Sequence, residues 1–225
     1  MIRMRLDIHI HSSYSSDGTV SPKEILRYAK KKELNGIAIT DHNVIQGSLK
    51  LWKENKNMKD FVIIPGIEVS SCEGHILALG IKEVIPRGLT PKETAQKITE
   101  LGGVAIASHP YRFWSGLGEE NVKKSKFEAI EVVNSRSLNR ENTKAMKLAE
   151  ELGCGKTGGS DCHSINHLGN AYTKLENPSY NADDILEEIR KGSTKGEGIH
   201  RRRTETPRYA AGCVYLWLKR GMKRI

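Results

Sequence analysis

Strand and helix signals alternate along most of this 225-residue chain, and this alternation limits the possible folds more than any other feature. Predicted strands cover residues 5–11, 36–40, 61–68, 74–80, 103–108, 129–134 and 157–161. Predicted helices cover residues 21–34, 45–56, 90–101, 139–152 and 182–191. Strands that are linked by helices pair in parallel. The pattern predicts an α/β fold, a (β/α)7 TIM-like barrel of parallel strands over residues 1–195.

Two of the predicted helices begin at a capping box. The segments SPKE (21–24) and TPKE (90–93) each place a hydroxyl residue at the N-cap, proline at the first helical position and glutamate three residues after the cap. The side chains of such a pair satisfy backbone N–H groups that the first helical turn leaves free. We therefore expect both helices to begin at these residues.

The first predicted strand has two different faces. In RLDIHIH (5–11), Leu6, Ile8 and Ile10 fall on one face, and polar side chains that include Asp7, His9 and His11 fall on the other. In barrels of this type, the chemistry is found at the C-terminal ends of the strands. The strand therefore predicts a packed side and a side that carries polar groups toward a site.

Composition and cysteine usage favour a cytoplasmic protein. No apolar run reaches the roughly 18 residues needed to span a bilayer, and the N-terminus has no apolar signal core. The four cysteines form no CxxC pair, which is typical of reduced thiols. Cys162 lies between Asp161 and His163, but in an extended segment its side chain points away from both. We expect it to be a small packed residue.

Residues 196–225 are predicted to form a basic C-terminal extension. From Lys195 onward the chain has nine Lys or Arg and two Glu, a net charge of +7 out of +9. A helix is expected from Pro207, after the basic run of Arg201, Arg202 and Arg203. This helix packs on the outer face of the barrel, contacts a membrane surface or nucleic acid, or brings its arginines over the site. The sequence leaves these alternatives open.

Six of the eight histidines lie at or beside predicted strand ends, and acidic residues accompany them. The histidines are His9, His11, His42, His75, His109 and His163, and the acids are Asp7, Asp17, Asp41, Glu68 and Asp161. Imidazole and carboxylate groups are the usual ligands of Zn, Mn and Fe. Nine of these eleven residues, all except Asp7 and Asp41, are candidate ligands, and nine exceed the need of one ion. Two or three divalent ions are therefore expected. Closely spaced ions can clamp a phosphate.

The ordered motifs resemble those of the polymerase and histidinol phosphatase (PHP) superfamily. They are DIHIHSSYSSDG (7–18), ITDHN (39–43), GIEVS (66–70) with EGH (73–75), SHPYR (108–112) and GSDCH (159–163). The resemblance implies a distorted (β/α)7 barrel with a trinuclear metal site. The SDG segment (16–18) is most similar to the nucleotide-phosphatase and oligonucleotide-exonuclease branch. The inserted domain that is common in that branch does not fit between His75 and His109.

The resemblance also implies a role for each ligand. His9, His11, Glu68 and Asp161 would hold the first metal ion. Glu68 would bridge to a second ion, held by His75 and His109. Asp17, His42 and His163 would hold a third. Several relatives have histidine at the position of Asp17, so an oxygen ligand here shifts the preference of the third site from Zn toward Mn, Fe or Mg.

Other residues have expected supporting roles. Asp7 is expected to assist catalysis by orienting ligand imidazoles, and Asp41 either does the same or caps a helix. Arg112 resembles the phosphate-binding arginine of the family, although a surface salt bridge is the alternative. Arg136 is a second candidate for binding substrate. His167 either assists the leaving group or is simply solvated.

The function that follows is a hydrolase of phosphate ester bonds. A metal-bridging hydroxide would attack phosphorus, with a small phosphorylated metabolite or a nucleotide as substrate. A second reading is a 5′-3′ exonuclease or phosphodiesterase on short oligonucleotides, with nucleic acid bound through the basic tail. A third is a non-catalytic, metal-stabilised module. The sequence indicates neither the natural substrate nor the oligomeric state.

Overall fold

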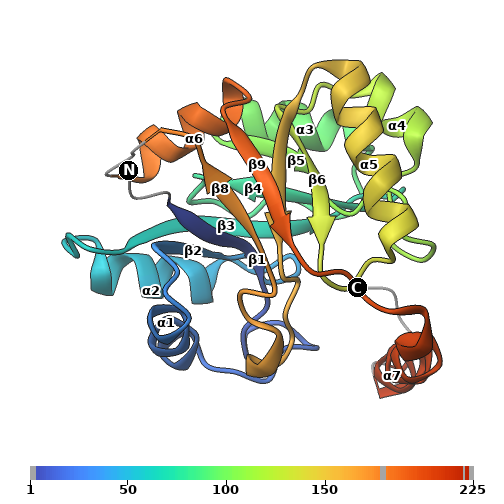
Figure 1. Cartoon of the computed structure of the whole chain (residues 1–225), viewed down its shortest axis with the longest axis horizontal. Helices are drawn as coiled ribbons and strands as arrows, with labels where there is room; N and C mark the ends of the chain where they lie inside the picture. The colour runs from blue at the N-terminus through green and yellow to red at the C-terminus, as the bar shows by residue number, and fades with distance from the viewer. Residues whose placement is uncertain (1–3, 178–180, 220, 223–225) are drawn as a thin grey trace.

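The chain forms a nine-stranded sheet that is rolled into a nearly closed barrel, shown in this computed structural model (Figure 1). The structure describes residues 4–177, 181–219, 221 and 222. The strands are β1 (Arg5–Ile10), β2 (Gly36–Ile39), β3 (Val62–Ser70), β4 (His75–Leu79), β5 (Val104–Ala107), β6 (Ala129–Asn134), β7 (Gly155–Gly159), β8 (Ala171–Leu175) and β9 (Thr194–Gly198). The α-helices are α1 (Pro22–Lys31), α2 (Gln46–Asn55), α3 (Pro91–Glu100), α4 (Glu119–Lys124), α5 (Asn139–Leu152), α6 (Ala182–Arg190) and α7 (Thr206–Lys219).

The α/β barrel prediction is confirmed, but the strand directions are mixed. The strands follow the order β7-β6-β5-β4-β3-β2-β1-β8-β9. Strands β1, β2 and β3 pair in parallel, as do β5, β6 and β7. Strand β4 is antiparallel to both of its neighbours, and β8 is antiparallel to β1 and β9. Only a short loop joins β3 to β4, and such a connection forces the antiparallel direction.

The barrel closes where β7 returns to β1 and β8. The hydroxyl of Thr173 on β8 accepts a hydrogen bond from N–H of Gly158 at 3.0 Å and lies 2.9 Å from its carbonyl oxygen. Just beyond β7, the N–H of Asp161 donates to the carbonyl of His9 at 2.7 Å. A Cβ atom on Gly159 would lie 2.4 Å from Cβ of His9. Glycine is therefore needed where β7 approaches β1.

Strands β8 and β9 were not predicted, because neither has an apolar run. The TKGEG segment of β9 contains two charged residues and two glycines. One of these, Gly196, is needed for packing, since a Cβ atom there would lie 2.4 Å from the carbonyl oxygen of Thr157. The strand forms because it pairs with β8 along its whole length and contacts β7. Tertiary packing, rather than local pattern, selects this strand.

The predicted starts of two helices are confirmed, but the predicted faces of the first strand are wrong. Ser21 and Thr90 cap α1 and α3 with complete capping boxes. On β1, Ile10 packs in a cluster with residues of α1, and Leu6 and Ile8 pack with residues of α6. Leu6, Ile8 and Ile10 therefore do not share one face, because the register of β1 shifts between Asp7 and Ile10. All residues of β1 after Arg5 are buried, so the strand is packed on both faces.

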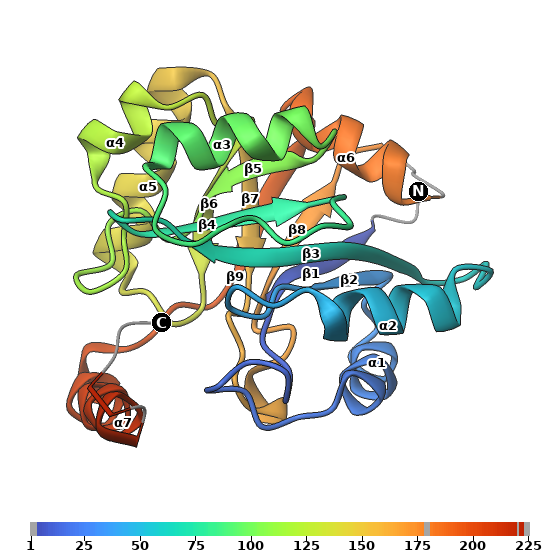
Figure 2. The ribbon, with the colours of Figure 1, turned by 180° about the vertical axis from the view of Figure 1, so that it is seen from behind.

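Helix α7 stands apart from the sheet in both views, beyond the end of β9 (Figure 2). Helices α1 and α2 lie on one side of the strands, and α3 to α6 lie on the other. The predicted extension, 196–225, reaches residues 220 and 223–225, which lie outside the described residues. Strand β9 runs across the expected boundary at 195, and the division into barrel and extension stays a prediction.

Candidate metal centre

All nine predicted metal ligands lie at one end of the barrel. They come from β1 and its following loop (His9, His11, Asp17), from beyond β2 (His42), from β3 and β4 (Glu68, His75), and from beyond β5 and β7 (His109, Asp161, His163). Strand β4 is antiparallel, and its first residue, His75, pairs with the last residue of β3, Ser70. The reversed direction of β4 therefore brings His75 to the end where the parallel strands finish.

The carboxylate of Glu68 is the centre of this arrangement. Five imidazoles surround it, with nitrogen–oxygen distances of 3.1 Å (His42 Nδ1), 3.3 Å (His11 Nε2), 3.4 Å (His9 Nε2), 3.1 Å (His75 Nδ1) and 3.2 Å (His109 Nε2). The first three rings face Oε2, and the other two face Oε1. Each oxygen of Glu68 thus has its own set of imidazole neighbours, which suits a carboxylate that bridges two ions.

Two aspartates, Asp17 and Asp161, face other imidazoles of the same centre. Oδ2 of Asp17 lies 3.0 Å from Nε2 of His163 and 3.5 Å from Nε2 of His42. Oδ1 of Asp161 lies 3.3 Å from Nε2 of His11 and 3.5 Å from Nδ1 of His163. The three residues expected to hold the third ion, Asp17, His42 and His163, therefore lie close together, and His11 lies beside them.

The donor atoms gather into four overlapping groups in which all atoms lie within 4.8 Å of one another. The groups are His11, Asp17, His42 and His163; His9, His11 and Asp161; His9, Glu68 and His109; and His42, Glu68 and His75. Among the described residues, several of these buried donor atoms have no hydrogen-bond partner, including Nε2 of His9, Nε2 of His11 and Oε2 of Glu68. Buried donors without partners are costly, and divalent ions would satisfy them. The residues therefore fit such ions.

The electrostatics of the centre favour carboxylates that are charged and several imidazoles that are neutral, as metal binding requires. Burial lowers the pKa of His42 well below its usual value and lowers the pKa of His109 to about 4. Burial alone would raise the pKa of Glu68, but His42 and His9 lower it well below its usual range. Burial would also lower the pKa of His9, but nearby carboxylates, led by Glu131, raise it.

Glu131, on β6, is a site residue that the sequence reasoning missed. Its Oε1 lies 2.8 Å from Nδ1 of His9, and its Oε2 accepts hydrogen bonds from the N–H of His109 at 2.9 Å and from Asn134 Nδ2 at 3.0 Å. The side chain is almost fully buried. A charged residue within an otherwise apolar strand, AIEVVN, was the available signal.

The expected orienting role of Asp7 is corrected by its contacts. Its Oδ1 accepts a hydrogen bond from the N–H of Ser160 at 2.9 Å, and its Oδ2 accepts one from the N–H of Gly169 at 2.9 Å. Burial raises the pKa of Asp7 to about 6, and these hydrogen bonds limit the rise. Asp7 thus holds the backbone of the loop after β7, and Glu131 orients the imidazole. A catalytic role for Asp7 stays a prediction.

Asp41 performs neither of its two expected roles. Its carboxylate accepts hydrogen bonds from the N–H of Ser12 at 2.6 Å and from the hydroxyl of Ser12 at 2.7 Å. The N-cap of α2 is Ile45, four residues later. Asp41 therefore fixes the loop after His11, and with it the path of the chain toward Asp17.

Arg112 is buried in the centre, which rules out the surface salt bridge. Its Nη1 donates to Oδ2 of Asp161 at 2.6 Å, and its Nη2 donates to the side-chain oxygen of Asn134 and to Ser137 Oγ at 3.4 Å. Only 8% of the residue is exposed. The guanidinium group therefore lies beside a predicted metal ligand, within reach of a group bound there.

Arg136 approaches the same carboxylate from the loop after β6. Its Nη1 lies 3.2 Å from Oδ1 of Asp161 and 2.7 Å from Nδ1 of His163. Arg112 and Arg136 thus contact different oxygens of one aspartate. Two guanidinium groups beside the predicted ligands make this side of the centre suited to an anion.

Two of the site residues have left-handed backbone conformations. The φ angle is 28° at His109 and 52° at Asp161, where residues other than glycine are uncommon. Such conformations cost roughly 1–3 kcal/mol each and cluster at functional sites. Here they turn both side chains toward the centre directly after β5 and β7.

The remaining predictions for this region concern Cys162 and His167. Cys162 is 2% exposed and packs with Ile10 and Ile25 under α1, so its prediction as a packed residue is confirmed. His167 is exposed, and its Nδ1 lies 3.2 Å from Ser164 Oγ. It lies outside the metal-binding groups, and a role with the leaving group stays a prediction.

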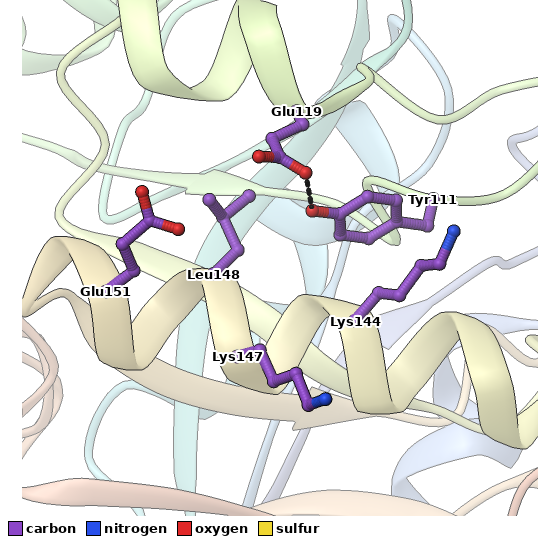
Figure 3. Close-up of a pocket in the computed structure, with 6 residues that line it drawn as sticks. All are labelled: Tyr111, Glu119, Lys144, Lys147, Leu148 and Glu151. Carbon is purple, nitrogen blue, oxygen red and sulfur yellow. Dashed lines mark hydrogen bonds between the residues drawn. The ribbon is translucent and has the colours of Figure 1, made fainter.

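A surface pocket of about 160 Å³ lies away from these ligands, between α4 and α5 (Figure 3). Tyr111 of the SHPYR motif points into it, and its hydroxyl donates to Oε2 of Glu119 at 2.8 Å. The ammonium group of Lys144 lies 5.6 Å from the centre of the same ring. Tyr111 therefore anchors the loop on the outside, while the next residue, Arg112, points inward.

Comparison with known proteins agrees with these features. The profile of the family described as PHP-associated matches residues 139–194. A two-domain protein of Bacteroides vulgatus that contains a predicted PHP-like metal-dependent phosphoesterase shares the fold, with a TM-score of 0.72 at 17% identity over 94% of this chain and 70% of that one. The chain belongs to the PHP superfamily. The resemblance seen in the sequence motifs is thereby confirmed.

Relatives of this PHP-superfamily protein occur in Methanocaldococcus jannaschii. The uncharacterized protein MJ1587 is 44% identical over 118 residues, which are 48% of this chain and 68% of that one. The uncharacterized protein MJ0417 is 32% identical over 192 residues, 81% of this chain and 75% of that one. An Endonuclease Q, solved with a 27-mer duplex that has an abasic lesion at its active site, shares the fold with a TM-score of 0.66 at 19% identity, over 88% of this chain and 60% of that one.

None of the described helices combines the length and apolar character needed to cross a membrane. The cytoplasmic location stays a prediction.

Proposed function

We propose that this PHP-superfamily protein is a metal-dependent hydrolase of phosphate esters, with a small phosphorylated metabolite or a nucleotide as substrate. The observation that carries the proposal is the position of Glu68, whose carboxylate faces five imidazoles and whose buried Oε2 has no hydrogen-bond partner among the described residues. Two or three divalent ions of Mn, Fe or Zn, with Mg as a further candidate, would be held by the nine ligands. Such ions activate water and neutralise charge on phosphoryl oxygens.

The chain's own residues would bind and orient the substrate. The guanidinium groups of Arg112 and Arg136 contact the two oxygens of Asp161 and would bind the phosphoryl group beside it. Glu131 holds the imidazole of His9, and Asp7 holds the loop that carries Asp161. In the reaction, water adds to phosphorus and the ester oxygen leaves as an alcohol.

A direct test combines metal analysis with a substrate screen. Elemental analysis of the purified full-length protein should find two or three divalent ions per chain. Protein loaded with Mn²⁺ should release inorganic phosphate from members of a panel of phosphomonoesters that includes sugar phosphates and nucleoside monophosphates. The proposal fails if metal-loaded protein leaves the whole panel and a set of oligonucleotides intact.

A second candidate activity is cleavage of short oligonucleotides, and exposed aromatic and basic residues favour it. Phe113 and Trp114 follow Arg112 directly, are 84% and 78% exposed, and pack edge to face with ring centres 4.9 Å apart. Exposed rings beside a phosphate-binding group suit the stacking of nucleobases. In the basic run, Arg201 is partly buried, and Arg202 and Arg203 are exposed.

The two activities predict different products from the same labelled oligonucleotide. A single-stranded oligonucleotide with a 5′-phosphate and a 3′ label would be shortened stepwise by a 5′-3′ exonuclease, and binding would weaken steeply as salt rises. A phosphatase would instead release only the terminal phosphate and leave the length unchanged. The Trp114→Ala variant should slow oligonucleotide cleavage and leave the hydrolysis of ribose 5-phosphate near the wild-type rate.

A further inference from the structure

The aromatic ring of Tyr209, on α7, lies against two guanidinium groups. Cζ of Arg201 is 4.2 Å from the centre of the ring, and Cζ of Arg136 is 5.1 Å from it. Both distances are within the range of a cation–π contact. Tyr209 comes from the C-terminal segment, whereas Arg136 belongs to the loop after β6. The ring therefore joins α7 to the barrel.

Arg201 fixes the geometry of this contact. Its Nε donates to the carbonyl of Arg136 at 2.8 Å, and its N–H donates to the carbonyl of Ser137 at 2.9 Å. Its Nη1 donates to Oγ1 of Thr206, at the start of α7, at 2.8 Å. One arginine thus binds both the loop that carries Arg136 and the helix that carries Tyr209.

The side chain of Arg136 continues from Tyr209 into the metal centre. Its Nη1 contacts Asp161 and His163, two of the predicted metal ligands. Only two contacts therefore separate α7 from the ligands. A side chain as long as arginine has many rotamers, and contacts along it reduce the entropy lost when it binds an anion.

Exposure along α7 agrees with a single inward face. Thr206, Tyr209 and Cys213 are partly buried, and their spacing places them on one side of the helix. Val214, Tyr215 and Leu218 are more than half exposed. The alternative in which α7 packs along the outer face of the barrel is not what the structure shows. The partly buried side of α7 is the one that carries Tyr209 to Arg136.

We propose that Tyr209 is a positioning residue that holds Arg136 toward the metal centre, so that α7 completes the anion-binding side of the site. This proposal rests on the proposed function, because it takes Arg136 to bind the phosphoryl group. Tyr209 acts through Arg136 and does not itself touch the reacting atoms.

The test is a double-mutant cycle in the full-length, Mn²⁺-loaded protein. It measures the Kd of inorganic phosphate by calorimetry, and kcat and KM for p-nitrophenyl phosphate. Tyr209→Ala should raise both the Kd and KM roughly threefold to thirtyfold, with a smaller change in kcat. Tyr209→Phe keeps the ring and should stay near wild type. Tyr215→Ala removes an exposed tyrosine of the same helix and is the matched control.

The decisive variant combines Tyr209→Ala with Arg136→Ala. If Tyr209 acts through Arg136, the double variant binds phosphate no more weakly than Arg136→Ala alone. The proposal would be overturned if the double variant bound phosphate more weakly than Arg136→Ala alone, by the factor that Tyr209→Ala shows by itself. It would also be overturned if Tyr209→Ala bound phosphate as tightly as wild type. If Tyr209→Ala does not unfold cooperatively, Tyr209→Leu, which fills the space without a π face, takes its place in the cycle.

The two proposals fail in different ways. Phosphate binding that depends on Tyr209 in a protein that hydrolyses no ester would reject the hydrolase and keep the positioning role. Wild-type protein that binds no phosphate would overturn the positioning role as well.

Discussion

The carboxylate of Glu131 lies 2.8 Å from Nδ1 of His9, on the side of the ring opposite to the metal-binding groups. Nε2 of the same ring faces Glu68 and Asp161 at 3.4 and 3.7 Å. An acceptor at Nδ1 directs the proton to that nitrogen and leaves Nε2 free to bind an ion. Glu131 therefore sets both the tautomer and the orientation of a predicted metal ligand, and would do so without contacting the ion.

Replacing Glu131 with alanine should weaken metal binding. Loss of such an acceptor typically costs about 10-fold to 100-fold in metal affinity. Competition of Mn²⁺ with a fluorescent chelator measures the effect. Glu120→Ala removes an exposed glutamate that pairs with Lys124 and should leave the affinity unchanged. Equal affinities of the Glu131→Ala variant and wild type would contradict the assigned role.

Replacing His9 with alanine distinguishes an enzyme from a metal-stabilised module. His9 is fully buried and belongs to two of the donor groups. In an enzyme, kcat for any substrate found should collapse, while the metal-free protein keeps a cooperative thermal transition. Rates with Mn²⁺ and Tm with and without the metal make the comparison. A variant that loses only the stabilisation by metal, with its rate unchanged, would support the non-catalytic reading.

Replacing Arg112 with alanine should reduce kcat by about 100-fold to 1000-fold, the usual cost of removing one donor to a developing charge. Arg112→Lys keeps the charge but cannot reproduce the fork that reaches both Asp161 and Asn134, and should recover only part of the rate. Steady-state kinetics with p-nitrophenyl phosphate measure this order. Arg140→Ala, at an exposed position on α5, is the control. A lysine variant as active as wild type would show that the two-pronged contact of the guanidinium group is not required for the full rate.

Adding a methyl group at residue 159 should destabilise the barrel where it closes. In Gly159→Ala, Cβ would lie 2.4 Å from Cβ of His9, so β1 and β7 must separate. Overpacking of this kind costs about 1–3 kcal/mol, and metal binding should weaken because His9 moves. Thermal unfolding with and without Mn²⁺ tests both effects. Gly212→Ala adds the same group within α7, where the new Cβ would meet no described atom outside its own helical turn within 4 Å, and should be neutral or stabilising.

Cys162 should resist alkylation in the folded protein although it lies between two predicted ligands. Burial raises the pKa of its thiol well above the usual value, so the reactive thiolate is disfavoured at pH 8. Mass spectrometry after brief treatment with iodoacetamide should find the label on the exposed Cys72 and not on Cys162. Both should react in denaturant. Rapid native labelling of Cys162 would mean that the loop after β7 opens.

The sequence alone was enough to predict the α/β barrel and to bring nine polar residues to one end of it. The periodic spacing of apolar residues identifies strands and helices from short stretches of sequence. Residues that directly follow parallel strands lie at the same end of the barrel. The SPKE and TPKE capping boxes depend only on contacts within four consecutive residues, and both form as predicted. His75 was placed on the correct strand, but its reversed direction came from the short β3–β4 loop.

Contacts between distant segments were decided only by the tertiary structure. Glu131 is 122 residues from His9 in sequence. The sequence around it shows only a charged residue in an apolar strand and does not indicate which side chain it contacts. Asp7 bonds to backbone 153 and 162 residues away, a role that its position beside His9 did not reveal. Strand β9 and the contact of Tyr209 with Arg136 depend on how the C-terminal segment returns to the barrel. The sequence determines which side chains are available, and long-range packing decides which of them meet.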